Sequence, residues 1–293
     1  ATTDANSGVI NMGTLEVNGT MALTTDGTGD ATIVNDDGIN FANSTVRGAL
    51  SATATDGNII DTGTLTITGA STFITRDAGS NIELNSSANA FAAAVTMKAD
   101  TGGSETFGNI AFVDSEAVKL HSSAGANGDL FIDGSTNGAV GGTLSITATT
   151  GDITQGLAVG VTGTSSFTTS ANNADITLSN TSNAFAGLVT LSTTGTTAHV
   201  IIDNGTTTLG IDTSTVGGDL TLTSGAAAGI TDNGNVTVGG NLVATTDANS
   251  GVINMDTLRV DGTMALTTDG TGDATVVNDD EIDFANSTVR GNL

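Results

Sequence analysis

The sequence predicts an all-β protein in which the chain winds as a single continuous parallel β-helix, a β-solenoid with a right-handed coil. Three observations predict this fold. The first fifty residues recur near the end of the chain, apolar and polar residues alternate in short runs, and related segments are separated by multiples of one step. A solenoid explains all three, because it grows by adding one coil at a time.

The repeat is nearly identical in its two copies. Residues 1–50 return as residues 244–293, offset by 243 positions. We therefore interpret 1–243 as one full solenoid repeat and 244–293 as the start of the next tandem repeat, without independent globular domains. The seven differences are Gly13/Asp256, Glu16/Arg259, Asn18/Asp261, Ile33/Val276, Gly38/Glu281, Asn40/Asp283 and Ala49/Asn292.

The pattern of these differences indicates strands with one face in contact with water. Leu15 and Val17 are retained as Leu258 and Val260, while Glu16 between them becomes Arg259. Retained apolar residues thus alternate with variable polar ones, which is the period of a half-buried strand. Glu16, Asn18 and Asn40 should point outward. The residues expected to point inward are Leu15, Val17, Ile33, Leu65, Ile67, Phe73, Phe91, Phe167 and Phe185.

Short β-branched runs separated by Gly, Thr, Ser, Asn and Asp are typical of strands joined by tight turns. No segment has a convincing helical period, and the absence of proline favours sheet throughout. The expected strands include 14–17, 21–25, 31–34, 65–68, 81–84, 130–132, 144–147, 175–178, 200–202, 220–223 and 235–238.

The coil length is suggested by a recurring motif, apolar-x-apolar-x-Gly. Its glycines are Gly19, Gly69, Gly163, Gly240 and Gly262. The four spacings between them are close to two, four, three and one steps of about 24 residues, and a shorter step of about 20 also fits, giving about 10–13 coils per 243-residue repeat. A β-sandwich array is the alternative fold, but its domains would recur at more even spacings.

Composition limits the partners. With 6 Lys+Arg against 31 Asp+Glu, the net charge of −25 argues against nucleic acid, whose phosphates need basic residues. No apolar run is long enough to span a membrane, and no signal peptide opens the sequence. The absence of cysteine excludes disulfides and thiolate metal sites.

Several phrases resemble a known class of sequence. They are Leu157–Thr169, Ala174–Phe185, Thr215–Leu222 and Ala228–Thr231. These phrases resemble the β-strand-repeat arrays of giant bacterial surface adhesins, relatives of filamentous haemagglutinin and of autotransporter passenger regions. The resemblance covers essentially the whole chain, and it implies a parallel β-helix in a filament that is extracellular or on the cell surface. It implies no catalytic residues.

Acidic turns are the candidate sites. Carboxylates on tight turns are ligands that Ca²⁺ prefers, but neither the EF-hand spacing nor the calcium β-helix signature is present. Solvated turn residues are the favoured interpretation, with a weak Ca²⁺ site as the alternative and no cofactor required. The residues are Asp26, Asp30, Asp36 and Asp37, with their counterparts Asp269, Asp273, Asp279 and Asp280.

An enzyme is not expected. His121 and His199 lie far apart in sequence without a nearby Cys or His, and no Gly-x-Ser-x-Gly elbow is present. Trp and Tyr are absent, and the basic residues are scattered, whereas an enzyme acting on acidic sugars usually needs both kinds of side chain. The nine Phe residues lie at strand positions and are expected to form an interior stack.

The preferred hypothesis is a structural segment of a surface filament, serving as stalk, sheath or adhesin shaft. Its main partner would be itself, either as the continued tandem array or as head-to-tail copies in a fibre. The first alternative is an adhesin module that binds glycans or a host surface. A carbohydrate-active β-helix enzyme or a phage-type fibre is the more distant alternative.

Overall fold

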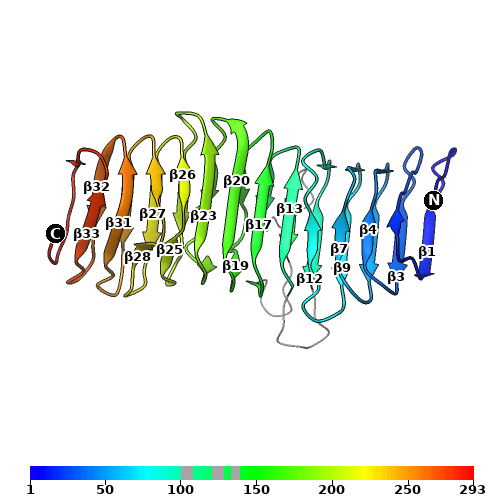
Figure 1. The fold of residues 1–293 in the computed structure, drawn as a ribbon, viewed down its shortest axis with the longest axis horizontal. Coiled ribbons are helices and arrows are strands. Elements are labelled where there is room, and N and C mark those ends of the chain that lie inside the picture. Colours follow the sequence, from blue (N-terminus) through cyan, green and yellow to red (C-terminus); the bar gives the residue numbers. More distant parts are fainter. Residues whose placement is uncertain (100–107, 121–128, 133–138) are drawn as a thin grey trace. The chain divides into compact units, whose positions relative to one another are not determined.

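The computed structural model describes residues 1–99, 108–120, 129–132 and 139–293, and all regular elements in these residues are β-strands (Figure 1). None of these residues belongs to a helix that could cross a membrane. The expected all-β class is therefore confirmed. Contacts divide the chain into two compact units, Ala1–Thr149 and Thr150–Leu293.

The strands of the first unit are β1 (Ile10–Leu15), β2 (Thr20–Met21), β3 (Ala31–Asn35), β4 (Ile39–Phe41), β5 (Ser44–Val46), β6 (Leu50–Ala54), β7 (Ile59–Asp61), β8 (Leu65–Ile67), β9 (Ser71–Thr75), β10 (Ile82–Leu84), β11 (Ala90–Phe91), β12 (Val95–Ala99), β13 (Ile110–Asp114), β14 (Val118–Leu120), β15 (Asp129–Ile132), β16 (Ala139–Val140) and β17 (Leu144–Ala148).

Those of the second unit are β18 (Ile153–Gln155), β19 (Gly160–Val161), β20 (Ser165–Asn172), β21 (Ile176–Leu178), β22 (Ala184–Phe185), β23 (Val189–Thr194), β24 (Val200–Asp203), β25 (Leu209–Ile211), β26 (Ser214–Val216), β27 (Leu220–Ser224), β28 (Ile230–Asp232), β29 (Val236–Val238), β30 (Leu242–Thr246), β31 (Ile253–Val260), β32 (Thr263–Thr267), β33 (Ala274–Asn278) and β34 (Asp283–Phe284).

Each unit is a stretch of parallel β-solenoid. In the first unit, β3, β6, β9 and β12 pair in parallel, so that Ile33 lies beside Ala52, then Phe73, then Met97. In the second unit, β21, β24, β27, β30 and β32 do the same, and each strand lies one turn of chain after its partner. Strands distant in sequence therefore supply each other's backbone hydrogen bonds, as the predicted fold requires.

The paired residues give the length of a turn. Ile33 pairs with Ala52 in a shorter turn, and Phe73 pairs with Met97 in a longer one. Such pairs correspond to turns of roughly 20–24 residues, which agree with the expected 10–13 coils per repeat. Longer steps of chain separate Ile82 from its partner Ile110, and Ile110 from its partner Leu144.

The interior is a column of apolar side chains. Along the first unit the rings of Phe41, Phe73, Phe91 and Phe112 follow one another, with centroids 6.2, 6.1 and 5.1 Å apart. In the second unit Phe167 lies 5.6 Å from Phe185. All six rings are buried, which confirms the predicted interior position for those phenylalanines.

The two copies of the repeat take the same strand register. Ile10 pairs with Ala31 and Met12 with Ile33, with a shift before Leu15 pairs with Asn35. In the second copy the equivalent residues, starting with Ile253 and Ala274, pair in the same way with the same shift. The local sequence therefore determines the turn in both units.

Burial of these equivalent residues depends on the neighbouring turn. Leu15 and Val17 are half-buried, whereas the prediction placed them inside. Their counterparts Leu258 and Val260 are buried, because β29 pairs with this part of β31. Phe284 shows the converse: it is 43% exposed, which corrects the expectation of an interior ring.

The other facing predictions agree with the structure. The remaining residues predicted to point inward, from Ile33 to Phe185, are all buried. Glu16 and Asn18 are exposed and Asn40 is half-buried, as expected for outward positions. Alternation along a strand therefore identified the interior face wherever turns are stacked on both sides.

Three details of the predicted organisation are wrong. The expected strand 21–25 is reduced to Thr20–Met21, and the expected strand 14–17 is the end of Ile10–Leu15. The motif glycines do not all stack: Gly262 donates its N–H to Gly240, one turn back, but Gly69 donates to Gly48, which donates to Gly29 and not to Gly19. The spacing between Gly240 and Gly262 is therefore the length of one turn, whereas Gly19 and Gly69 lie at different positions around the coil.

Candidate functional site

The acidic turns lie at exposed corners of the solenoid. Asp26, Asp30, Asp36 and Asp37 are all exposed, and Oδ1 of Asp30 accepts the N–H of Ala49 in the next turn at 2.7 Å. The equivalent Asp273 accepts the N–H of Asn292 at 2.6 Å, and Asp280 accepts the N–H of Glu281 at 2.8 Å. Some of the carboxylate oxygens in these turns therefore already accept hydrogen bonds from backbone N–H groups.

These carboxylates are not gathered around one point. Among the described residues, no group of three or more His, Cys, Asp or Glu side chains could hold a metal ion. The calcium site at Asp26, Asp30, Asp36 and Asp37, and at Asp269, Asp273, Asp279 and Asp280, remains a prediction from the turn sequences alone.

One corner of the second unit carries a ladder of polar side chains. Oδ1 of Asp152 accepts the N–H of Asp175, and Oδ1 of Asp175 accepts the N–H of His199, at 2.8 and 2.7 Å. Nδ1 of His199 accepts the N–H of Asp219 at 3.0 Å, and Asp219 accepts the N–H of Asn241 at 2.7 Å. Each side chain therefore caps the backbone of the following turn.

In this ladder His199 has a structural role, because its side chain accepts a backbone hydrogen bond from the next turn. Its Nδ1 is the acceptor, so the neutral ring with hydrogen on Nε2 fits this contact. The other histidine, His121, lies outside the described residues. Sequence reasoning found neither the ladder nor its equivalent in the first unit, where Asn58, Asn81 and Asn109 act in the same way. The recurrence of Asn and Asp at one-turn spacing was the available signal.

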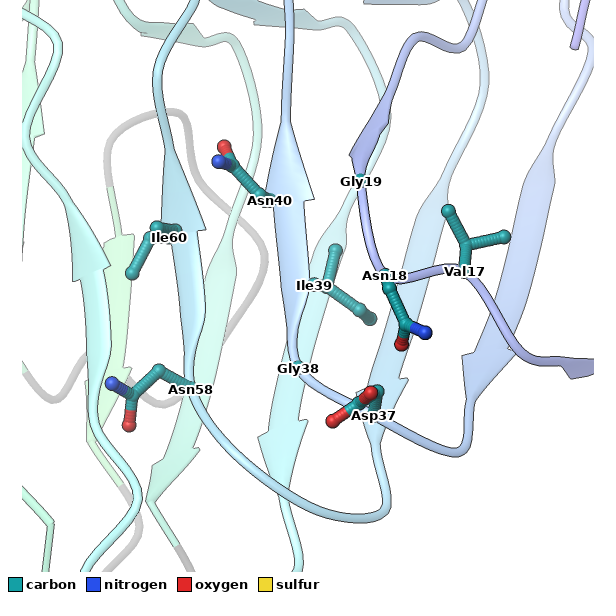
Figure 2. A pocket seen from close by; sticks show the side chains of 9 residues that line it. All are labelled: Val17, Asn18, Gly19, Asp37, Gly38, Ile39, Asn40, Asn58 and Ile60. Carbon is teal, nitrogen blue, oxygen red and sulfur yellow. The ribbon is translucent and has the colours of Figure 1, made fainter.

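A surface hollow lies in the first copy of the repeat. Its volume is about 380 Å³, and we call it the amide hollow (Figure 2). Figure 2 shows the amides of Asn18 and Asn40 and the carboxylate of Asp37 around it, with Ile60 on the adjacent strand. The lining residues are Val17, Asn18, Gly19, Asp37, Gly38, Ile39, Asn40, Asn58 and Ile60.

The second copy of the repeat has an equivalent hollow of about 290 Å³. Here the three variable lining positions carry Asp261, Glu281 and Asp283 in place of Asn18, Gly38 and Asn40. The lining therefore gains three negative charges between the copies. Sterics explain why position 38 is glycine in the first copy. A Cβ there would lie 2.8 Å from the carbonyl oxygen of Asn58, in the next turn.

A second pair of hollows is also formed by equivalent residues. In the first copy Gly13 and Glu16 line a hollow of about 260 Å³, and in the second copy Asp256 and Arg259 line one of about 310 Å³. Five of the seven differences between the copies thus line one of the two kinds of hollow. Alternation in the sequence predicted outward positions for Glu16, Asn18 and Asn40, but the surface that the five positions share depends on the pairing of turns.

Comparison with known proteins identifies the class of the chain. A family described as "Repeats of unknown function (DUF5649)" matches residues 28–98 and 115–192. These two stretches cover just over half of the sequence, and the chain belongs to this family. No curated protein and no solved structure matches the chain.

Proposed function

We propose that this chain is a structural repeat segment of an extracellular or cell-surface filament. The observation that carries the proposal is the behaviour of the two repeat copies. The two near-identical copies of fifty residues form the same strand register in each unit, and Leu258 and Val260 are buried where a further turn covers them. Such a unit adds to a stack of turns without a change in its strand register, which suits a long shaft.

The acidic surface supports the same proposal. A net charge of −25 lies on a protein whose buried residues are mainly apolar. Side-by-side association of such shafts is opposed by charge repulsion, which keeps them separate at low ionic strength. The resemblance to surface adhesin arrays adds the extracellular location to this proposal.

Imaging of the native protein tests it. Antibodies raised against this chain should label intact, unpermeabilised cells, and electron microscopy of the labelled material should show fibres. Protease treatment of the intact cells should remove the label, while a cytoplasmic control protein remains. Label found only after permeabilisation, or on compact particles, would contradict the proposed filament.

Glycan binding at the amide hollow is the second candidate function, favoured by the clustering of variable residues in its lining. Amides and a carboxylate can donate to and accept from sugar hydroxyls, and Val17 and Ile60 offer apolar contact. We expect the chain to bind neutral glycans on an array. The variant with Asn18→Asp and Asn40→Asp, which introduces two residues of the second copy, should lose this signal, whereas Asn241→Asp, outside the hollow, should not.

Two outcomes would contradict glycan binding at the amide hollow. Binding that is unchanged in the double variant would place any glycan contact elsewhere. Absence of binding by the unmodified chain would remove the candidate function. Gly38 is left unchanged in this test, because the carbonyl of Asn58 leaves no room for a side chain there.

A further inference from the structure

Three buried polar side chains lie at the end of a strand, or directly after it, where alternate residues of the strand are buried. They are Asn35, Asp114 and Asn204, and each follows two buried residues at alternate positions. Asn278 is the counterpart of Asn35 in the second copy of the repeat and is half-buried. Among these residues Asp114 alone is an acid.

The amides bond in one pattern. Oδ1 of Asn204 accepts the N–H of Phe185, one turn back, at 2.7 Å. Its Nδ2 donates to the carbonyl of the same Phe185 at 3.1 Å and to that of Thr208 at 2.8 Å. Asn35 repeats this with Val17 and Gly38, at 2.9, 3.0 and 2.8 Å. Each amide thus replaces one rung of the backbone ladder, acting as acceptor and donor at once.

Asp114 makes only half of this pattern. Its Oδ1 accepts the N–H of Phe91, one turn back, at 3.3 Å, and the N–H of Glu116 at 3.4 Å. Its Oδ2 is buried and has no hydrogen-bond partner, and the residue is 1% exposed. The second polar atom of each asparagine is Nδ2, which donates, whereas the second oxygen of an ionised carboxylate has no hydrogen to donate.

We propose that Asp114 is a proton-binding site: in the folded chain its carboxyl group is neutral under mildly acidic conditions, and its O–H then donates to the carbonyl of Phe91 as the asparagine amides do in their turns. Loss of this proton would leave an unpaired charge inside the solenoid and loosen the contact between Asp114 of β13 and Phe91 of β11. The first unit then carries a pH-sensitive position where the second unit, at Asn204, has an amide.

The surrounding charges agree with this assignment. Burial raises the pKa of Asp114 from 3.8 to about 6, the N–H groups of Phe91, Glu116 and Ser115 oppose the rise, and the nearby Glu116 adds to it. On the neighbouring strands, Glu83 of β10 and Lys119 of β14 lie at outward, half-buried positions. β17 carries no titratable residue, and the carboxylate of Asp61 in the turn before bonds to Asn89.

The sign of the pH effect follows from this direction. Because the pKa is higher in the folded than in the unfolded chain, the folded chain binds the proton more tightly. The contribution of Asp114 to stability is therefore fully present below pH 3.8, declines as the pH rises through about 6, and stays lost above it. The full effect is a change of about a hundredfold in the opening equilibrium.

Hydrogen exchange of the amide of Phe91, compared between the full-length chain and its Asp114→Asn variant, tests the proposal. Near pH 4 the two chains should exchange at similar rates. At pH 8 the variant should exchange about a hundredfold more slowly, because its amide donates at every pH. The matched control is Asn204→Asp, which should produce the same pH dependence at Phe185: exchange similar to that of the unmodified chain near pH 4 and about a hundredfold faster at pH 8.

A carboxyl titration of Asp114 followed by NMR gives an independent readout. A midpoint near 6 that coincides with the change in exchange supports the proposal. A midpoint below 4, or a ratio of exchange rates between the chain and Asp114→Asn that is the same at pH 4 and pH 8, would overturn it.

Discussion

Replacement of Phe41 by alanine is expected to lower the free energy of unfolding by about 3–5 kcal/mol, the usual cost of a cavity left by a buried ring. Phe41 is fully buried, and its ring packs edge to face 6.2 Å from that of Phe73. The neighbouring turns on both sides are held by backbone pairing at Thr20–Met21 and Ile59–Asp61, so the cavity cannot easily close.

The chain contains its own control for this variant. Phe284 occupies the same position in the second copy of the repeat but is 43% exposed. Phe284→Ala should cost less than about 1 kcal/mol, because much of its surface already contacts water. Urea unfolding followed by far-UV circular dichroism can measure both, since the chain has no Trp or Tyr for fluorescence. Equal losses for the two variants would contradict the burial described for Phe41.

Replacement of Asn183 by alanine is the second large effect, with an expected loss of about 3 kcal/mol. The side chain is 2% exposed and makes five hydrogen bonds. It accepts the N–H of Val159 at 2.8 Å and donates to the carbonyls of Leu178 and Asp203 at 3.0 and 2.9 Å. Alanine would leave these backbone groups without partners in a buried site.

The exposed Asn241 provides the comparison for Asn183. It also accepts a backbone N–H, that of Thr263 at 2.9 Å, but water can replace this contact. Asn241→Ala should therefore cost less than about 1 kcal/mol. A similar cost for both variants would mean that buried asparagines contribute no more than the surface ladder does.

The sequence was sufficient to predict the class of fold, because the solenoid depends on short-range patterns. The alternation around Ile33, Leu65 and Phe73 identified inward residues correctly, and the spacing between Gly240 and Gly262 gave the length of one turn. These patterns recur along the chain because the backbone N–H and C=O groups of every turn must pair with those of the next turn.

The position of a residue around the coil could not be predicted in the same way. The motif glycines Gly19 and Gly69 have similar neighbours in sequence, yet they stack in different columns. Because the turns differ in length, a motif can return at a different position around the solenoid axis, and its own residues do not indicate which position that is. The half-buried Leu15 and exposed Phe284 were missed because their burial depends on the adjacent turn and not on their own sequence.

The candidate site was predictable only in part. The acidic turns were visible in the sequence, but the shared surface of Asn18, Gly38 and Asn40 required the pairing of two turns. The role of Asp114 was hidden for the same reason. Its partner Phe91 lies one turn back, and only comparison with Asn35 and Asn204 shows that an amide would be expected there.

Distances between spin labels measure the stacking of turns most directly, and the absence of native cysteine makes labelling specific. In the first unit, Asn11, Thr32, Ser51, Thr72 and Thr96 occupy successive turns in one column. Labels at Asn11 and Thr96 should therefore be about 19 Å apart at the backbone, and labels at Thr32 and Thr96 about 14 Å apart. The predicted result is that the distance to Thr96 decreases by about 5 Å when the first label moves from Asn11 to Thr32, which is one turn closer. Label distances that do not change by one strand spacing per turn would contradict the parallel β-solenoid.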